Sequence, residues 1–120
     1  MLFTQKSEVD IHEMSPLALA FVGDAVLELL VRARLVGTTR LQPNRLHTVA
    51  THYVSAHAQN LELDIIEPML TDAEAAVLRR GKNASKATVA KHATVQEYRA
   101  STGFECLLGW LYLQGRNDRI

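Results

Sequence analysis

The chain has 120 residues, of which 48% are hydrophobic and 22% are charged, and its formal net charge at pH 7 is zero. This length suits one domain with a single core, and the composition excludes disorder and an evenly basic nucleic-acid binder. No apolar run reaches the roughly 18 to 20 residues that span a bilayer, and residues 1–14 are too polar and acidic for a signal peptide. Cys106 is the single cysteine, which excludes an internal disulfide and suits a small buried side chain in a cytoplasmic protein.

The first predicted helix has a clear start. Ser15 is a favourable cap, and Pro16 occupies the first turn, where its missing N–H costs nothing. Apolar residues then recur at spacings of three and four as far as about Leu35. Gly37 is expected to end this helix.

Helical patterning continues through the middle of the chain. A looser segment over 38–45 leads into one or two helices over 46–55 and 56–66, and Pro68 ends the last of them. Almost no strand-like alternation appears, which favours an all-helical protein.

The second half of the chain begins with a capping box, in which Thr71 is the cap and Glu74 follows three residues later. The helix that it opens is expected to end at Gly81, and an exposed loop over 82–93 is expected to follow. A final helix over about 94–113 is apolar almost all round, so it should be central. The expected architecture is an all-α helical bundle.

Two carboxylates stand in the most apolar stretches of these helices. Asp24 lies within 19–28 and Glu105 lies within 104–113, where an acidic side chain is rare unless it is paired or binds a metal. The apolar residues on the helical face of Asp24 are Leu17, Phe21, Leu27 and Val31. This face is therefore expected to point toward the core or toward a subunit interface.

Two acidic groups on neighbouring core helices repel each other unless a cation lies between them. Carboxylate oxygens with water completing the shell suit Mg²⁺, and a metal near a polyanion suits phosphodiester hydrolysis. The competing interpretation is that Asp24 or Glu105 pairs with a buried arginine or histidine, and the residues alone leave both possibilities open. The sequence contains no di-iron, zinc-protease or phosphate-loop motif.

Basic residues gather in one segment of this neutral chain. Residues 79–99 contain six of its thirteen lysines and arginines but a single acidic residue, Glu97. Such a local patch is typical of a surface that binds a polyanion, or of an ordinary solvated helix end and loop.

Several motifs, in order along the chain, carry a family resemblance. Residues 19–28 resemble the signature of the ribonuclease III catalytic domain, and residues 104–113 resemble its second acidic motif. The chain is most similar to the Mini-III subfamily, whose members consist of the catalytic domain alone; the further matching stretches are 43–47, 79–84 and 98–105. The resemblance implies a ribonuclease III-type endonuclease domain over 15–120, with an N-terminal segment over 1–14 and no double-stranded-RNA-binding domain.

The resemblance also implies a function. It implies a homodimer that cleaves double-stranded RNA with Mg²⁺, each subunit cutting one strand and leaving 5′-phosphate and 3′-hydroxyl ends. For this subfamily the substrate is the large-subunit (23S) ribosomal RNA precursor, and a large-subunit ribosomal protein assists. The alternatives are a non-catalytic RNA-binding or ribosome-assembly protein with the same fold, and a helical oligomerisation module with no role in RNA.

The resemblance assigns roles to the two carboxylates. Asp24 matches the catalytic aspartate, and Glu105 matches the metal-binding glutamate. Full-length ribonuclease III enzymes have two further acidic residues at the positions of Ala20 and Thr102. The subfamily shares the loss at the position of Thr102 and generally that at the position of Ala20, which implies fewer protein ligands and more water on the metal. Glu28, one turn after Asp24, is expected in the dimer interface, or else beside the metal site.

Without a separate RNA-binding domain, the basic segment is expected to supply most contacts to RNA phosphates, which give affinity but no base readout. The residues expected to make these contacts are Arg79, Arg80, Lys82, Asn83, Lys86, Lys91, His92 and Arg99. Arg99 also precedes Glu105 by only six residues, so it either holds the scissile phosphate or anchors one of the two carboxylates.

Overall fold

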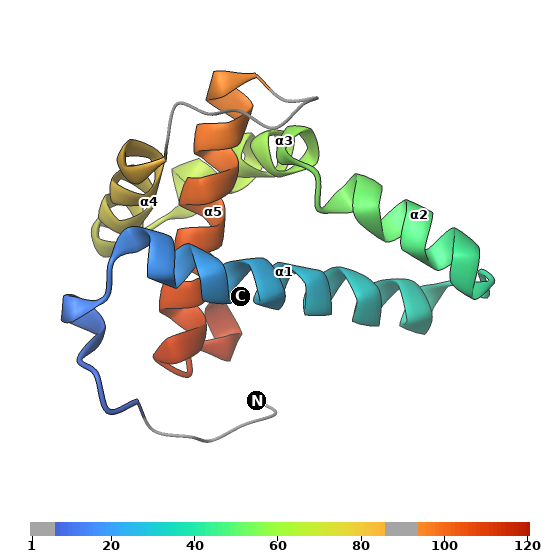
Figure 1. Cartoon of the computed structure of the whole chain (residues 1–120), viewed down its shortest axis with the longest axis horizontal. Coiled ribbons are helices and arrows are strands. Elements are labelled where there is room, and N and C mark those ends of the chain that lie inside the picture. The colour runs from blue at the N-terminus through green and yellow to red at the C-terminus, as the bar shows by residue number, and fades with distance from the viewer. Residues whose placement is uncertain (1–6, 86–93) are drawn as a thin grey trace.

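The computed structural model describes residues 7–85 and 94–120, and every regular element within these ranges is a helix (Figure 1). The α-helices are α1 (Pro16–Thr38), α2 (Pro43–Tyr53), α3 (Ala56–Ile66), α4 (Asp72–Ala84) and α5 (Val95–Leu113). Three short 3-10 helices accompany them: η1 (Ile11–Glu13), η2 (Glu67–Met69) and η3 (Asn117–Arg119). The predicted all-α fold is confirmed.

Helix α5 is the centre of the bundle. It packs against α1, α3 and α4, and Figure 1 shows it running through the middle of the molecule while α1 crosses it. Most of α5 from Ala100 to Leu111 is buried, as its apolar sequence predicts. The second half of α1 extends away from α5 and packs against α2. Within the described residues, no helix is both long and apolar enough to cross a membrane.

The expected helix ends at Gly37 and Gly81 are wrong. Helix α1 continues one residue past Gly37, and α4 continues to Ala84. A glycine that stops a helix adopts positive φ, and in the described part of the chain only Gly115 does so. Gly81 serves close packing instead, because a Cβ there would lie 2.8 Å from the Cα of Gly103 on α5.

Helix α2 begins at Pro43, three residues earlier than predicted, because proline at the first helical position is already set at a helical φ. The other helix starts agree with the prediction. The hydroxyl of Ser15 accepts a hydrogen bond from the Ala18 N–H at 3.1 Å. In the capping box of α4, Thr71 N–H donates to the Glu74 carboxylate at 2.9 Å and Glu74 N–H donates to the Thr71 hydroxyl at 3.2 Å.

Both ends of the described chain contribute to the core. Ile11 of η1 and Met14 pack against the cluster around Leu19 and Cys106, so the predicted N-terminal segment is joined to the domain by apolar contacts. Cys106 is fully buried as predicted, and burial raises the pKa of its thiol to about 11.

An ion pair fastens the C-terminal turn to α4. Arg119 of η3 donates two hydrogen bonds to the buried carboxylate of Glu74, at 2.7 and 2.9 Å, and a third to the Met69 carbonyl at 3.2 Å. The guanidinium of Arg119 holds the pKa of Glu74 down at about 2, so this carboxylate is charged at neutral pH.

Candidate active site

Two glycines bring the backbones of α1 and α5 into direct contact. A Cβ on Gly23 would lie 1.6 Å from the carbonyl oxygen of Glu105, and a Cβ on Gly109 would lie 1.9 Å from the carbonyl oxygen of Leu19. No other residue type fits at either position without moving the helices apart. We call this contact the glycine crossing. Asp24 follows Gly23 directly and the Glu105 backbone is part of the contact, so the crossing brings the two predicted carboxylates together.

The charge of Asp24 disfavours the charge of Glu105. The pKa of Glu105 is raised to about 8, mainly by burial and then by the neighbouring Asp24, through a hydrogen bond and through its charge. Glu28, one turn further along α1, raises the pKa of Glu105 by a smaller amount. Burial and the neighbouring Asp24 therefore both disfavour the ionised form of Glu105.

The competing interpretation, a buried salt bridge, is wrong for the described part of the chain. The ion pairs within residues 7–85 and 94–120 join other side chains, and none includes Asp24 or Glu105. Within the described residues, neither carboxylate is therefore paired with an arginine, lysine or histidine, and a cation between them stays a prediction.

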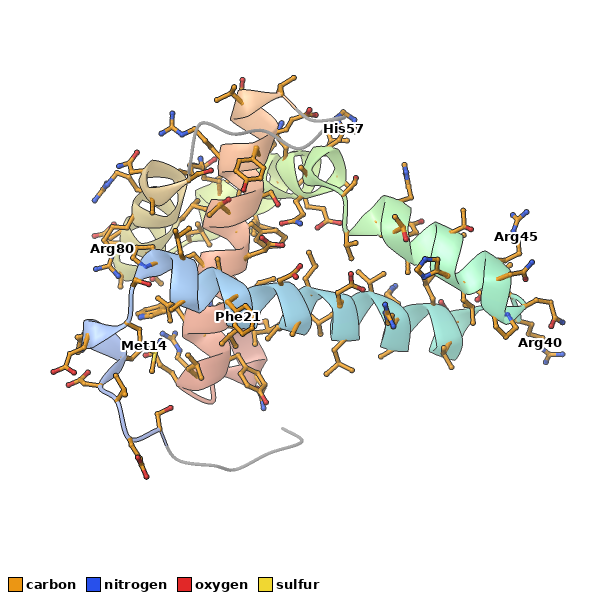
Figure 2. The ribbon with its side chains drawn as sticks, in the orientation of Figure 1. Met14, Phe21, Arg40, Arg45, His57 and Arg80 are labelled. Carbon is orange, nitrogen blue, oxygen red and sulfur yellow. The ribbon has the colours of Figure 1, made fainter. Side chains whose placement is uncertain are left out.

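The expected orientation of Asp24 needs a correction. Leu27 is buried as predicted, but Asp24 is exposed and Phe21 is 82% exposed on α1 (Figure 2). Gly23 lies on the side of α1 that packs against the central helix α5, and this side is the buried one. Asp24 therefore does not point into the core of this chain, and the alternative of a subunit interface stays a prediction.

The structure adds a residue that the sequence did not mark. Gln59 on α3 is 1% exposed, and its side-chain nitrogen donates to the Glu105 carboxylate at 3.4 Å and to the Val54 carbonyl at 2.9 Å. A glutamine in an amphipathic helix is usually solvated. The available signal was its spacing of four from Leu63, which places both residues on the buried side of α3.

The donor set fits a hard divalent cation that keeps much of its water. Among the described residues, no group of three or more histidine, cysteine, aspartate and glutamate side chains is arranged to hold a metal. Two carboxylates are too few for a zinc site, which uses three or four protein ligands, but they suit Mg²⁺, which commonly binds through one or two carboxylates and several waters. The mutual repulsion of Asp24 and Glu105 is what such a cation would relieve.

The two positions without acidic residues are filled in other ways. Ala20 is buried in the apolar cluster beneath the start of α1. The hydroxyl of Thr102 donates to the Tyr98 carbonyl at 3.1 Å and contacts Ser85 at 3.4 Å. Neither position carries an acidic side chain, and the predicted reduction in protein ligands to the metal stays a prediction.

The basic residues at the end of α4 differ in their surroundings. Arg79 and Arg80 are exposed on α4, and none of the ion pairs in the described part of the chain involves either of them. Lys82 lies in the last turn of α4 rather than in a loop, and it pairs with Glu67 at 3.6 Å. The other predicted contact residues of this segment, Lys86, Lys91 and His92, lie outside the described residues.

Arg99 joins α5 to the end of α4. Its Nε donates to the Lys82 carbonyl at 3.1 Å, and its Nη2 donates to the Asn83 side-chain oxygen at 3.0 Å. Such bonds satisfy carbonyls that the last turn of a helix leaves free. The prediction that Arg99 anchors Asp24 or Glu105 is wrong, because its hydrogen bonds go to the end of α4 and no ion pair among the described residues joins it to either carboxylate. Its predicted contact with the scissile phosphate is not tested by these bonds.

Comparison with known proteins gives the class first. The family model described as the Ribonuclease III domain matches residues 17–116, so this all-α bundle is the domain of a ribonuclease III-type endoribonuclease. Mini-ribonuclease 3 of Enterococcus faecalis is 44% identical over 92% of this chain and 86% of its own length. Mini-ribonuclease 3 of Brevibacillus brevis is 43% identical over 97% of this chain and 88% of its own length. The chain therefore belongs to the Mini-ribonuclease 3 group of the ribonuclease III family, as its motifs predicted.

The fold agrees with a solved structure. A crystal structure of a Fusobacterium nucleatum protein is similar to this chain with a TM-score of 0.84 and 30% sequence identity. The similarity covers 96% of this chain and 89% of that one, so it includes the helices that form the glycine crossing.

Proposed function

We propose that this endoribonuclease uses Mg²⁺ to cut double-stranded regions of the large-subunit (23S) ribosomal RNA precursor and so matures its ends in the cytoplasm. The observation that carries the proposal is the pairing of Asp24 and Glu105 at the glycine crossing, with no cationic side chain paired to either in the described residues. A protein that only binds RNA has no use for two adjacent carboxylates, because they repel phosphate.

Asp24 and Glu105 are the residues that would hold the cation. When bound there, a divalent cation would supply an activated water for attack on phosphorus and would neutralise charge on the scissile phosphate. The protein positions the two carboxylates. Because the glycine crossing fixes the backbones that carry them, both side chains need little reorganisation when the substrate binds. Water attacks phosphorus and the bond from phosphorus to the 3′-oxygen breaks. One product therefore keeps a 5′-phosphate, and the other ends in a 3′-hydroxyl.

We place this site in a homodimer in which each subunit cuts one strand. Leu17 and Phe21 precede Asp24 on the exposed side of α1, and an aromatic ring that is 82% exposed beside a catalytic carboxylate suits a surface that a partner covers. Glu28, which pairs with Arg32 at 3.1 Å, would lie at the edge of that surface. Sedimentation of the free protein should give twice the mass of one chain, and a monomer at assay concentrations would remove this part of the proposal.

Arg79 and Arg80 are the proposed phosphate contacts, with Lys86 and Lys91 as further candidates outside the described residues. Replacing both arginines by alanine should weaken binding to duplex RNA and lower the slope of log Kd against log salt by about 1 to 2. Arg40→Ala is the matched control, because Figure 2 shows Arg40 at the opposite end of the molecule from Arg80. Equal slopes for the double variant and the control would remove these arginines from the RNA interface.

Cleavage of the precursor itself tests the proposed function. Incubation of structured 23S precursor RNA with the protein and Mg²⁺ should give cuts on both strands near the mature ends, with 5′-phosphates, and an excess of EDTA should abolish them. A large-subunit ribosomal protein added to the reaction should increase the rate at these sites. Stable binding of the RNA with no new ends in Mg²⁺ would instead favour the non-catalytic RNA-binding or ribosome-assembly protein.

A further inference from the structure

Gln59 lies behind the half-exposed carboxylate of Glu105, at the start of α3. It is among the most completely buried side chains of the described residues, yet it belongs neither to the apolar core nor to an ion pair. A buried amide needs a reason, because apolar side chains of similar volume pack there without polar atoms to satisfy.

The orientation of the amide follows from its stronger contact. The Val54 carbonyl can only accept a hydrogen bond, so the group that faces it at 2.9 Å must be the nitrogen of Gln59. Val54 caps the end of α2, where helix carbonyls lack their usual partners, so this bond is structural in origin. It fixes the amide plane and leaves one N–H of the same nitrogen to donate elsewhere.

That second N–H is directed to Glu105. The distance from the Gln59 nitrogen to the Glu105 carboxylate is 3.4 Å, at the long end for a hydrogen bond, as catalytic contacts often are before substrate and metal bind. With both N–H groups used as donors, the Gln59 oxygen is left buried with no protein partner among the described residues. Both N–H groups of the Gln59 amide therefore have acceptors, while its oxygen has no donor among the described residues. Packing alone does not explain this arrangement, because an apolar side chain of similar volume would leave no polar atom unpaired.

We propose that Gln59 is a positioning residue that orients the Glu105 carboxylate for cation binding from its anchor on the Val54 carbonyl. This inference rests on the proposed function. It adds an uncharged side chain, the Gln59 amide, that holds one of the two metal-binding carboxylates in place. A support that donates to one carboxylate oxygen leaves the other oxygen free to face the cation.

Gln59→Met tests the inference, because methionine has nearly the same length and volume but no donor. Loss of a hydrogen bond that orients a metal ligand typically lowers metal affinity or activity 10- to 100-fold. The Mg²⁺ concentration for half-maximal cleavage should therefore rise by at least about 10-fold, and calorimetric binding of Mn²⁺ to the RNA-free protein should weaken to a similar degree. Binding of duplex RNA in EDTA should stay unchanged. Gln114→Met is the matched control, since Gln114 is exposed and its side chain donates to the Trp110 carbonyl of its own helix.

The outcomes separate the two proposals. If Asp24→Asn abolishes cleavage but Gln59→Met has the metal dependence of the control, only the positioning role fails; if Asp24→Asn cleaves normally, the proposed site itself fails. Should Gln59→Met not fold, the natural protein still decides: the side-chain amide resonances of Gln59 should shift when Mg²⁺ is added and should not shift in Glu105→Gln. The absence of any Mg²⁺-induced shift would overturn the inference.

Discussion

Replacing Asp24 by asparagine should lower the rate of RNA cleavage by on the order of 10³-fold or more, while binding of duplex RNA in EDTA stays close to normal. Asparagine keeps the shape of the side chain but removes one of the two negative charges available to a cation. The measurement is single-turnover cleavage of a duplex RNA in saturating Mg²⁺, with a gel shift in EDTA for binding.

The same variant should unfold at an equal or higher temperature than the natural protein. Asp24 is exposed, and its charge disfavours the ionised form of Glu105, so its removal relieves a repulsion and breaks no ion pair in the described residues. Asp64→Asn is the control, because Asp64 is also an exposed helical aspartate, on α3, and should keep full activity. Cleavage by Asp24→Asn at the rate of this control would contradict the catalytic role of Asp24.

Gly23→Ala should destabilise the protein by about 3 kcal/mol or more, and should remove the active site with the fold. The added methyl group would lie 1.6 Å from a backbone oxygen of α5, and backbone cannot rotate away as a flexible side chain can. The measurement is the free energy of unfolding from urea denaturation, together with cleavage activity.

Gly37→Ala is the matched control on the same helix. Apart from the adjoining backbone of its own helix, a Cβ at Gly37 would meet none of the described atoms within 4 Å, and Gly37 does not have positive φ. This change should stabilise the protein by about 0.5 to 1 kcal/mol, the ordinary gain from replacing glycine inside a helix. Similar unfolding free energies for the two alanine variants would show that the glycine crossing is not as tight as described.

Much of this fold could be predicted from local patterns. The caps at Ser15 and Thr71 determine where α1 and α4 begin, and they act through neighbouring atoms that the sequence specifies directly. The central place of α5 follows from its lack of a polar face. Asp24 and Glu105 could be predicted as site residues for a related reason, since each is an acidic residue in an apolar stretch.

The errors arise where two distant segments decide the outcome. A glycine in a helical pattern either ends the helix or allows the backbone of another helix to pack closely against it. Gly81 allows close packing of α5, and this cannot be read from the residues around Gly81 alone. The exposure of Asp24 depends in the same way on which side of α1 meets Gly109. Gln59 could not be assigned to the site at all, because its contact with Glu105 joins helices that are far apart in the sequence.

The glycine crossing has a consequence for how the enzyme ages. Because the contact that places the two carboxylates is also a backbone contact between the two core helices α1 and α5, separation of these helices takes the catalytic pair apart and opens the core in one event. Loss of activity on storage or heating would then follow loss of structure with the same time course. Separation of α1 and α5 would therefore produce little folded but inactive protein.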